Sequence, residues 1–138
     1  SVLRNPTSNM TYIKSLSYNE NLYEYNKANK EGFNEVVFLN IYGNIAEGAT
    51  SNIFIIKDKK IYTPKISDGI LPGVVRNWVI KNFKVCEKHL DKEDLYSADE
   101  VFITNSILGI MKIVQFEERS YSTSMVERIR SEYEQFII

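Results

Sequence analysis

Two short segments carry residue types that suit the binding of a small phosphorylated cofactor. The first places one carboxylate, Glu47, shortly before a polar pair, Ser51 and Asn52, at the start of an apolar run. The second is residues 71–76, LPGVVR, in which Pro-Gly precedes a predicted helix. Backbone N–H groups at a helix start bind phosphate, and an acid beside a cofactor ring nitrogen keeps that nitrogen protonated. The sequence therefore predicts a cradle that contacts a cofactor at both ends.

The residues around the first segment are predicted to form strands. Residues 35–42 are rich in β-forming residues, a Gly-Asn turn follows, and residues 51–56 are apolar. A second turn at 58–60 leads to a short strand at 61–63, which Pro64 ends. We therefore expect an antiparallel meander of three strands beneath the cradle.

Apolar residues at helical spacing alternate with short apolar runs along the rest of the chain. The predicted helices cover residues 15–30, 73–83 and 92–98, together with a closing helix that Ser122 or Thr123 caps and that runs to Phe136. The predicted strands cover residues 84–89 and 101–103, and polar residues 104–106 follow the second strand, where α/β sheets tend to bind ligands. This order predicts a mixed α/β fold in a single domain, residues 1–138.

Composition and charge exclude several classes of protein. The 138 residues are 43% hydrophobic with a net charge of -1, so the chain can bury a core but has no positive field to attract nucleic acid. No apolar run reaches the roughly 18 residues that cross a membrane. The single cysteine, Cys86, excludes an internal disulfide and a multi-cysteine metal site, and it suits a reducing compartment. We expect a cytoplasmic protein without metal that binds a small molecule or a protein.

Three motifs, in this order, resemble those of the class IV aminotransferase family. They are EGATSNIF at 47–54, LPGVVR at 71–76 and ADEVFITNS at 98–106, and the resemblance spans roughly residues 4–116. The family comprises pyridoxal-phosphate enzymes, among them branched-chain and D-amino-acid aminotransferases and 4-amino-4-deoxychorismate lyases. The resemblance implies the large, C-terminal domain of the D-amino-acid aminotransferase-like fold, an α/β (α+β mixed) domain with a mostly antiparallel or mixed sheet and flanking helices.

The resemblance also implies roles for single residues. Lys14 corresponds to the lysine that forms the Schiff base with pyridoxal 5'-phosphate, and Glu47 to the acid that faces the cofactor's ring nitrogen. Arg76 is expected to form an ion pair at the helix start rather than to bind the phosphate. His89 and Cys86 are assigned no role. The other implied cofactor contacts are Ser51, Asn52, the backbone N–H groups of Val74 and Val75, and Asn105 and Ser106.

Within the family, residues 104–110, TNSILGI, resemble the lyase branch, since branched-chain aminotransferases tend to carry a Gly-Thr-Ala-Ala-Glu type segment here. The chain departs from the lyases at 111–113, where Met-Lys-Ile replaces the usual Met-Pro-Val. The implied reaction is the folate-pathway conversion of 4-amino-4-deoxychorismate to 4-aminobenzoate and pyruvate. The first alternative is a branched-chain or D-amino-acid aminotransferase on the same fold.

Family members also have a smaller N-terminal domain, which supplies an arginine to the cofactor phosphate and part of the substrate pocket. The resemblance implies that this domain is absent here, because the chain begins shortly before Lys14. The apolar surface left uncovered is expected to promote association, with a homodimer as the implied assembly. A second alternative is therefore an inactive domain or an assembly module that keeps the fold but lacks one wall of the pocket.

Overall fold

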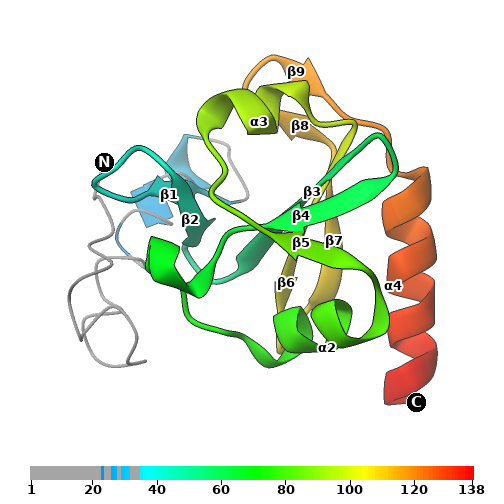
Figure 1. The fold of residues 1–138 in the computed structure, drawn as a ribbon. Coiled ribbons are helices and arrows are strands. Elements are labelled where there is room, and N and C mark those ends of the chain that lie inside the picture. Colours follow the sequence, from blue (N-terminus) through cyan, green and yellow to red (C-terminus); the bar gives the residue numbers. More distant parts are fainter. Residues whose placement is uncertain (1–22, 24–25, 28, 32–34) are drawn as a thin grey trace.

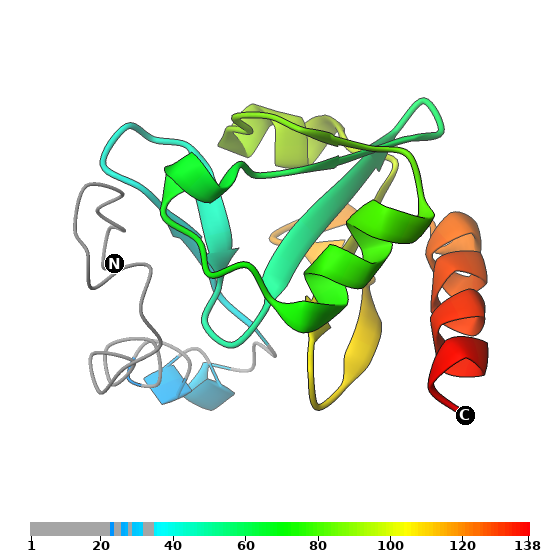
Figure 2. The same ribbon diagram turned by 60° about the horizontal axis from the view of Figure 1, so that its bottom comes forward.

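The computed structural model describes residues 23, 26–27, 29–31 and 35–138 (Figures 1 and 2). Residues 23, 26–27 and 29–30 are helical, in agreement with the part of the predicted helix 15–30 that they sample. Lys14 and the remainder of that helix lie outside the described residues. No helix among the described residues has the length and apolar character needed to cross a membrane.

A five-stranded mixed sheet with the strand order β5-β4-β3-β6-β7 forms the centre of the described structure. The central strand β3 (Asn52–Lys57) pairs antiparallel with both β4 (Lys60–Thr63) and β6 (Glu100–Asn105). β7 (Gly109–Ile113) pairs antiparallel with β6, whereas β5 (Val85–Glu87) pairs parallel with β4. The sheet is therefore mixed, and the predicted strands at 51–56, 61–63, 84–89 and 101–103 are confirmed in type.

The predicted three-stranded meander is wrong in its first strand. β1 (Val37–Leu39) pairs with β2 (Ile45–Gly48) in a separate two-stranded sheet, not with residues 51–56. The turn between them is longer than the expected Gly-Asn pair, because the Oδ1 atom of Asn40 accepts hydrogen bonds from the N–H groups of Tyr42 (2.9 Å) and Asn44 (3.1 Å). This hairpin carries Glu47 on β2.

Helices cover both faces of the main sheet, because side chains along a strand point alternately to opposite faces. On one face, Phe54 and Phe102 stack with their ring centroids 4.7 Å apart and pack against α2 (Val74–Asn82) and α4 (Ser124–Ile137). On the other face, buried aliphatic side chains pack against α3 (Lys92–Ser97) and the β1–β2 hairpin. α2 therefore packs through Val75 and Val79 on the face of the sheet that carries Phe54 and Phe102.

A buried carboxylate from β6 holds the start of α4. Thr123 occupies the N-cap position, as predicted, but its side chain makes no capping hydrogen bond. Glu100, 6% exposed, accepts hydrogen bonds from the N–H groups of Met125 (3.0 and 3.1 Å) and Val126 (3.0 Å). A negative charge at a helix start is stabilising, so Glu100 ties α4 to the sheet. Between β7 and α4, β8 (Gln115–Phe116) and β9 (Arg119–Ser120) form a short hairpin.

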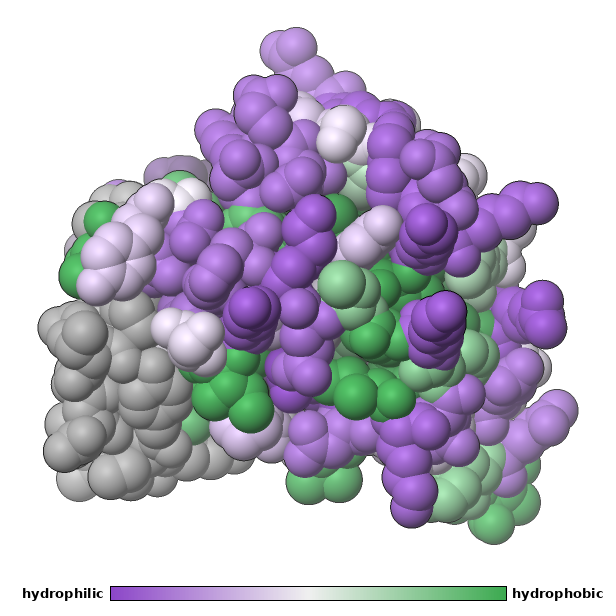
Figure 3. All heavy atoms as spheres, viewed as in Figure 1, coloured by the Kyte–Doolittle hydropathy of each residue, from purple (hydrophilic) through white to green (hydrophobic). Residues whose placement is uncertain are grey.

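Exposed apolar side chains include two groups, at the β6–β7 turn and at the end of α4. Ile107 and Leu108 are 90% and 59% exposed at the turn between β6 and β7. Phe136, Ile137 and Ile138 are exposed at the end of α4, where Figure 3 shows hydrophobic side chains at the lower right, in addition to those near the centre of the same face. These side chains are compatible with association, and the homodimer stays a prediction.

Tyr121 is expected to make stability depend on pH in the alkaline range. Its hydroxyl donates a 2.6 Å hydrogen bond to the carbonyl oxygen of Leu95, and burial raises the pKa of Tyr121 from 10.0 to about 12, with Arg119 opposing the shift. The folded state then keeps a proton that the unfolded state loses, so the contribution to stability is complete below about pH 10 and is lost as the pH rises towards about 12. Urea unfolding at about pH 9 and about pH 11 should show this loss in the native protein.

The slope of the free energy of unfolding against pH should be smaller in Tyr121→Phe, because phenylalanine has no proton to release. Tyr42→Phe, at a position that is 66% exposed, is the matched control and should keep the native slope. An unchanged slope in Tyr121→Phe would contradict this assignment.

Candidate functional site

The first two sequence motifs meet through the side chains of Glu47 and Asn52. Glu47 is 5% exposed, and its Oε2 atom accepts a 3.1 Å hydrogen bond from the N–H group of Leu71. Asn52 donates from Nδ2 to the carbonyl oxygen of Leu71 at 2.9 Å and accepts from the N–H group of Gly73 at 3.3 Å. Its Nδ2 atom also lies 3.5 Å from Oε2 of Glu47. The carboxylate and the helix start therefore belong to one hydrogen-bonded unit.

Gly73 is required for this close approach. A Cβ atom at Gly73 would lie 2.5 Å from Oδ1 of Asn52, which is closer than real Cβ contacts allow. The amide of Asn52 cannot move aside without losing its bonds to residues 71 and 73, so a larger residue at position 73 would separate the two motifs.

Removal of the Asn52 side chain is expected to destabilise the protein locally. Asn52→Ala leaves the carbonyl oxygen of Leu71 and the N–H group of Gly73 without their partner, which costs about 1–3 kcal/mol in the free energy of unfolding. Asn82→Ala is the matched control, because the amide of Asn82 also donates to a backbone carbonyl, of Trp78, but at an exposed position. Urea unfolding should show a change of less than about 0.5 kcal/mol for the control. Equal effects of the two substitutions would contradict the role of Asn52.

Glu35 is a further residue of the site that sequence reasoning missed. Its Oε1 atom accepts from the N–H group of Ala49 (3.0 Å), and its Oε2 atom accepts from the hydroxyls of Thr50 (3.2 Å) and Ser51 (2.9 Å). Glu35 thus fixes the loop that follows Glu47. The contacts span 14 to 16 residues, so no local pattern could have identified them. Within the described residues the Ser51 hydroxyl shapes this loop, and its contact with a cofactor stays a prediction.

The start of α2 offers unpaired hydrogen-bond donors. Gly73 is the N-cap residue in an extended conformation, and within the described residues the N–H groups of Val74 and Val75 have no acceptor. The first N–H groups of a helix lack partners inside the helix, and they carry the positive end of its dipole. The Val74 side chain is 78% exposed, so the helix start is open to solvent.

Thr104 and Ser106 lie at the end of β6 beside this helix start. Thr104 pairs with Asn52 across the β3–β6 ladder, so both side chains are on the same face of the sheet. The Thr104 hydroxyl is buried and has no partner among the described residues. Ser106 is exposed at the turn that follows, and Figures 1 and 2 both place the β6–β7 hairpin beside the start of α2. The structure therefore gathers several unpaired hydroxyl and N–H groups in one region.

Asn105 shapes the turn between β6 and β7. Its Oδ1 atom accepts from the N–H groups of Ile107 (3.0 Å) and Leu108 (2.6 Å), whereas its Nδ2 atom has no partner within the described part of the chain. A shallow cavity of about 100 Å³ adjoins this turn, lined by residues 106–110 together with Tyr133, Glu134 and Ile137. The contact of Asn105 with the cofactor remains a prediction.

Arg76 makes the expected ion pair. Its Nη2 atom lies 2.7 Å from Oε1 of Glu87 at the end of β5, and it also donates to the carbonyl oxygen of Pro64 at 3.1 Å. The interaction connects the first turn of α2 to the ends of β4 and β5. Arg76 therefore fixes the helix that presents the N–H groups of Val74 and Val75.

His89 has a partner that its sequence position did not indicate. Its Nδ1 atom lies 2.6 Å from Oδ1 of Asp68, a fully buried residue in the 3-10 helix η3 (Ile66–Asp68). Asn40 also donates to Asp68 Oδ1, at 3.3 Å. These contacts join β1, η3 and the segment after β5, so they hold the loop that leads to residues 71–73.

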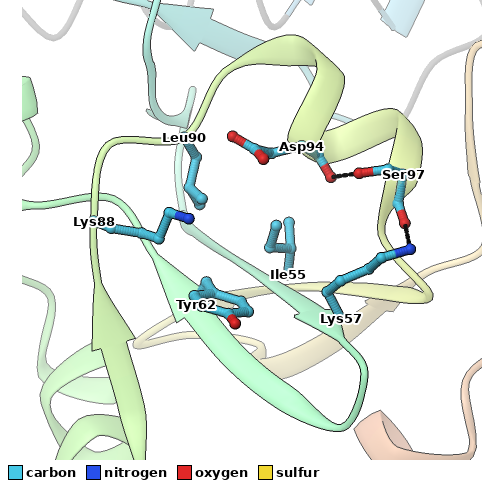
Figure 4. Close-up of a pocket in the computed structure, with 7 residues that line it drawn as sticks. All are labelled: Ile55, Lys57, Tyr62, Lys88, Leu90, Asp94 and Ser97. Atoms are coloured by element: carbon cyan, nitrogen blue, oxygen red, sulfur yellow. Dashed lines mark hydrogen bonds between the residues drawn. The ribbon is translucent and has the colours of Figure 1, made fainter.

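A second cavity, also of about 100 Å³, does not belong to this site. Figure 4 shows its lining residues: Ile55, Lys57, Tyr62, Lys88, Leu90, Asp94 and Ser97. Lys57 ends β3, whereas Asn52 begins it, so the cavity lies at the other end of the strand from the cradle. None of the predicted site residues lines it. Among the described residues, no cluster of three or more His, Cys, Asp or Glu side chains could hold a metal ion.

Comparison with known proteins identifies related chains. The sequence model of the family described as Amino-transferase class IV matches residues 1–116. The chain is 36% identical over 132 residues to the aminodeoxychorismate lyase of Bacillus subtilis, covering 92% of this chain and 45% of that protein. It is 34% identical over 102 residues to the branched-chain-amino-acid aminotransferase of Escherichia coli, covering 70% and 33%.

The fold agrees with these relationships. A solved structure of the branched-chain amino acid aminotransferase from Escherichia coli superimposes with a TM-score of 0.90 at 29% identity, covering 96% of this chain and 49% of that one. The chain thus spans 33–49% of the length of these matched proteins.

Proposed function

The chain belongs to the class IV aminotransferases, a family of pyridoxal-phosphate enzymes, and we propose that it is the cofactor-binding part of a 4-amino-4-deoxychorismate lyase. The proposed reaction gives 4-aminobenzoate and pyruvate, a step of folate biosynthesis. The observation that carries the proposal is the 3.1 Å hydrogen bond from the Leu71 N–H group to Glu47, because it couples an acid suited to a ring nitrogen with a helix start suited to a phosphate. The similarity to the lyase of Bacillus subtilis over 92% of the chain supports the choice of reaction.

The residues present fit pyridoxal 5'-phosphate. The N–H groups of Val74 and Val75 would bind the phosphate, with the Ser106 hydroxyl from the neighbouring turn. The buried, unpaired hydroxyl of Thr104 also fits a ligand or an ordered water at this place, since buried polar groups normally have partners. When bound, the cofactor supplies an electron sink for the bond-breaking steps.

The described residues of the cradle would orient the cofactor and keep its ring nitrogen protonated. Glu47 would hold a proton on the ring nitrogen, and its carboxylate is kept in place by the Leu71 N–H group. Asn52 fixes residues 71 and 73, so the ring end and the phosphate end of the cradle keep a constant separation. Lys14, outside the described residues, is proposed to bind the cofactor covalently and to move the proton during turnover. Removal of pyruvate then leaves the aromatic product.

An aminotransferase is the second candidate, and the similarity to the Escherichia coli enzyme in sequence and fold supports it. The two functions differ in what happens to the cofactor. A lyase returns the cofactor unchanged after each turnover, whereas an aminotransferase leaves it carrying the amino group until a keto acid accepts that group. The third candidate is an inactive domain or an assembly module with the same fold.

Substrate tests on the purified chain with added pyridoxal phosphate separate these candidates. Formation of 4-aminobenzoate and pyruvate from 4-amino-4-deoxychorismate, without any added keto acid, is the expected result. Turnover of branched-chain or D-amino acids only when a keto acid is present would identify an aminotransferase and contradict the lyase. Cofactor binding without either reaction would identify an inactive domain.

We further propose a cytoplasmic homodimer as the working form. Light scattering after size-exclusion chromatography should give twice the mass of one chain, and a single-chain mass would contradict this assembly.

A further inference from the structure

Arg76 is a buried cation in an unusual place. It belongs to the first turn of α2, and its side chain is 2% exposed. The positive end of the helix dipole disfavours a cation there, and burial of a guanidinium costs free energy unless partners compensate it. The first turn of α2 has no acidic residue that could offset this charge locally. The helix start thus combines two positive contributions, the dipole and the guanidinium.

The compensation of this charge is incomplete. Nη2 of Arg76 is bonded to Pro64 and Glu87, but the buried Nε atom has no hydrogen-bond partner among the described residues. The side chain of Glu87 is 41% exposed, so solvent screens its negative charge more than the buried positive one. Two buried carboxylates lie at the loop before the helix begins: Glu47, which accepts from the N–H group of Leu71, and Asp68, which is paired with His89. The guanidinium of Arg76 therefore adds a buried positive charge close to the start of α2, and the half-exposed Glu87 opposes it directly.

We propose that Arg76 strengthens phosphate binding at the start of α2 through its charge, without contact, and that Glu87 weakens this effect. The inference rests on the proposed function, since the phosphate is that of the cofactor. Arg76 is the third residue of α2, so its charge lies within about 10 Å of an anion at the first N–H groups, a range over which buried charges are weakly screened. Arg76 is thus a positioning and electrostatic residue rather than a phosphate ligand.

The test compares two ligands that do not need Lys14, because neither has an aldehyde. Pyridoxine 5'-phosphate carries the phosphate, and pyridoxine lacks it. Isothermal titration calorimetry at low and high ionic strength would measure their affinities for the native chain and for Glu87→Gln. Glutamine keeps an oxygen that can accept the hydrogen bond from Arg76 and removes only the negative charge.

The expected result is tighter binding of pyridoxine 5'-phosphate by Glu87→Gln, by about 3-fold at low ionic strength, with the gain reduced by salt. The affinity for pyridoxine should not change. The matched control is Glu118→Gln, an exposed residue in the turn between β8 and β9, at the opposite end of the structure from α2 in Figure 1. It changes the net charge equally and should alter neither affinity.

A purely structural role of Arg76 makes the opposite prediction. If the pair with Glu87 only braces the helix, Glu87→Gln weakens the binding of the phosphorylated ligand or leaves it unchanged, and either result would overturn the inference. Arg76→Met should lower the affinity for pyridoxine 5'-phosphate by about 10-fold, and the Glu87→Gln result decides the question even if this variant does not fold. A native chain that binds neither ligand would overturn the proposed function itself.

Discussion

Glu47→Gln is expected to lower turnover of 4-amino-4-deoxychorismate by about 100-fold or more while the protein still folds and binds the cofactor. Glutamine has nearly the same size, and its oxygen can accept the hydrogen bond that the Leu71 N–H group now donates to the carboxylate. It lacks the negative charge that keeps a proton on the ring nitrogen, so the cofactor becomes a weaker electron sink. Steady-state rates and the absorption spectrum of the bound cofactor measure the two effects.

Glu100→Gln is the matched control for the loss of a buried carboxylate. Glu100 is 6% exposed, compared with 5% for Glu47, but it caps α4 at the opposite end of β6 from Thr104. The control should lower the free energy of unfolding and leave the cofactor spectrum unchanged. Native turnover in Glu47→Gln would show that this carboxylate does not act on the cofactor ring.

Lys14→Ala is expected to have the largest effect on activity, a loss of about 10⁴-fold, since one side chain would provide both the covalent bond and the proton transfer. The support for Lys14 is the family match over residues 1–116, which includes it. Lys27→Ala, which removes an exposed lysine on the predicted helix, is the matched control and should keep native turnover. Turnover by Lys14→Ala at the native rate would refute the proposed mechanism.

Local patterns in the sequence predicted most elements of the main sheet and its helices. The spacing of apolar residues identified α2. In the structure the side chain of Asp91 caps α3 by accepting from the N–H group of Asp94. β2 was missed because its four residues, IAEG, include a glycine and a buried acid, which are uncommon in strands.

β7 was missed for a different reason. It is an edge strand, and its exposed residues break the apolar pattern. Lys112 in this strand lies 2.8 Å from Glu127 of α4, and this contact lowers the pKa of the Glu127 carboxyl. The departure from the lyase pattern at 111–113 thus has a structural role, an ion pair between β7 and α4.

The residues of the site could be predicted from the sequence, but their arrangement in space could not. The two motifs do meet through Glu47, Asn52 and Gly73, as their chemistry indicated. The support from Glu35 and the position of Thr104 depend on contacts between distant parts of the chain and on the register of β3 and β6. Such contacts follow from tertiary packing, which no local pattern encodes.

Intact mass spectrometry after borohydride reduction tests whether the chain binds pyridoxal phosphate covalently through Lys14. We expect a single adduct that peptide mapping assigns to Lys14 and that is absent from Lys14→Ala. No adduct on the native chain, or adducts spread over exposed lysines, would contradict the proposed role of Lys14.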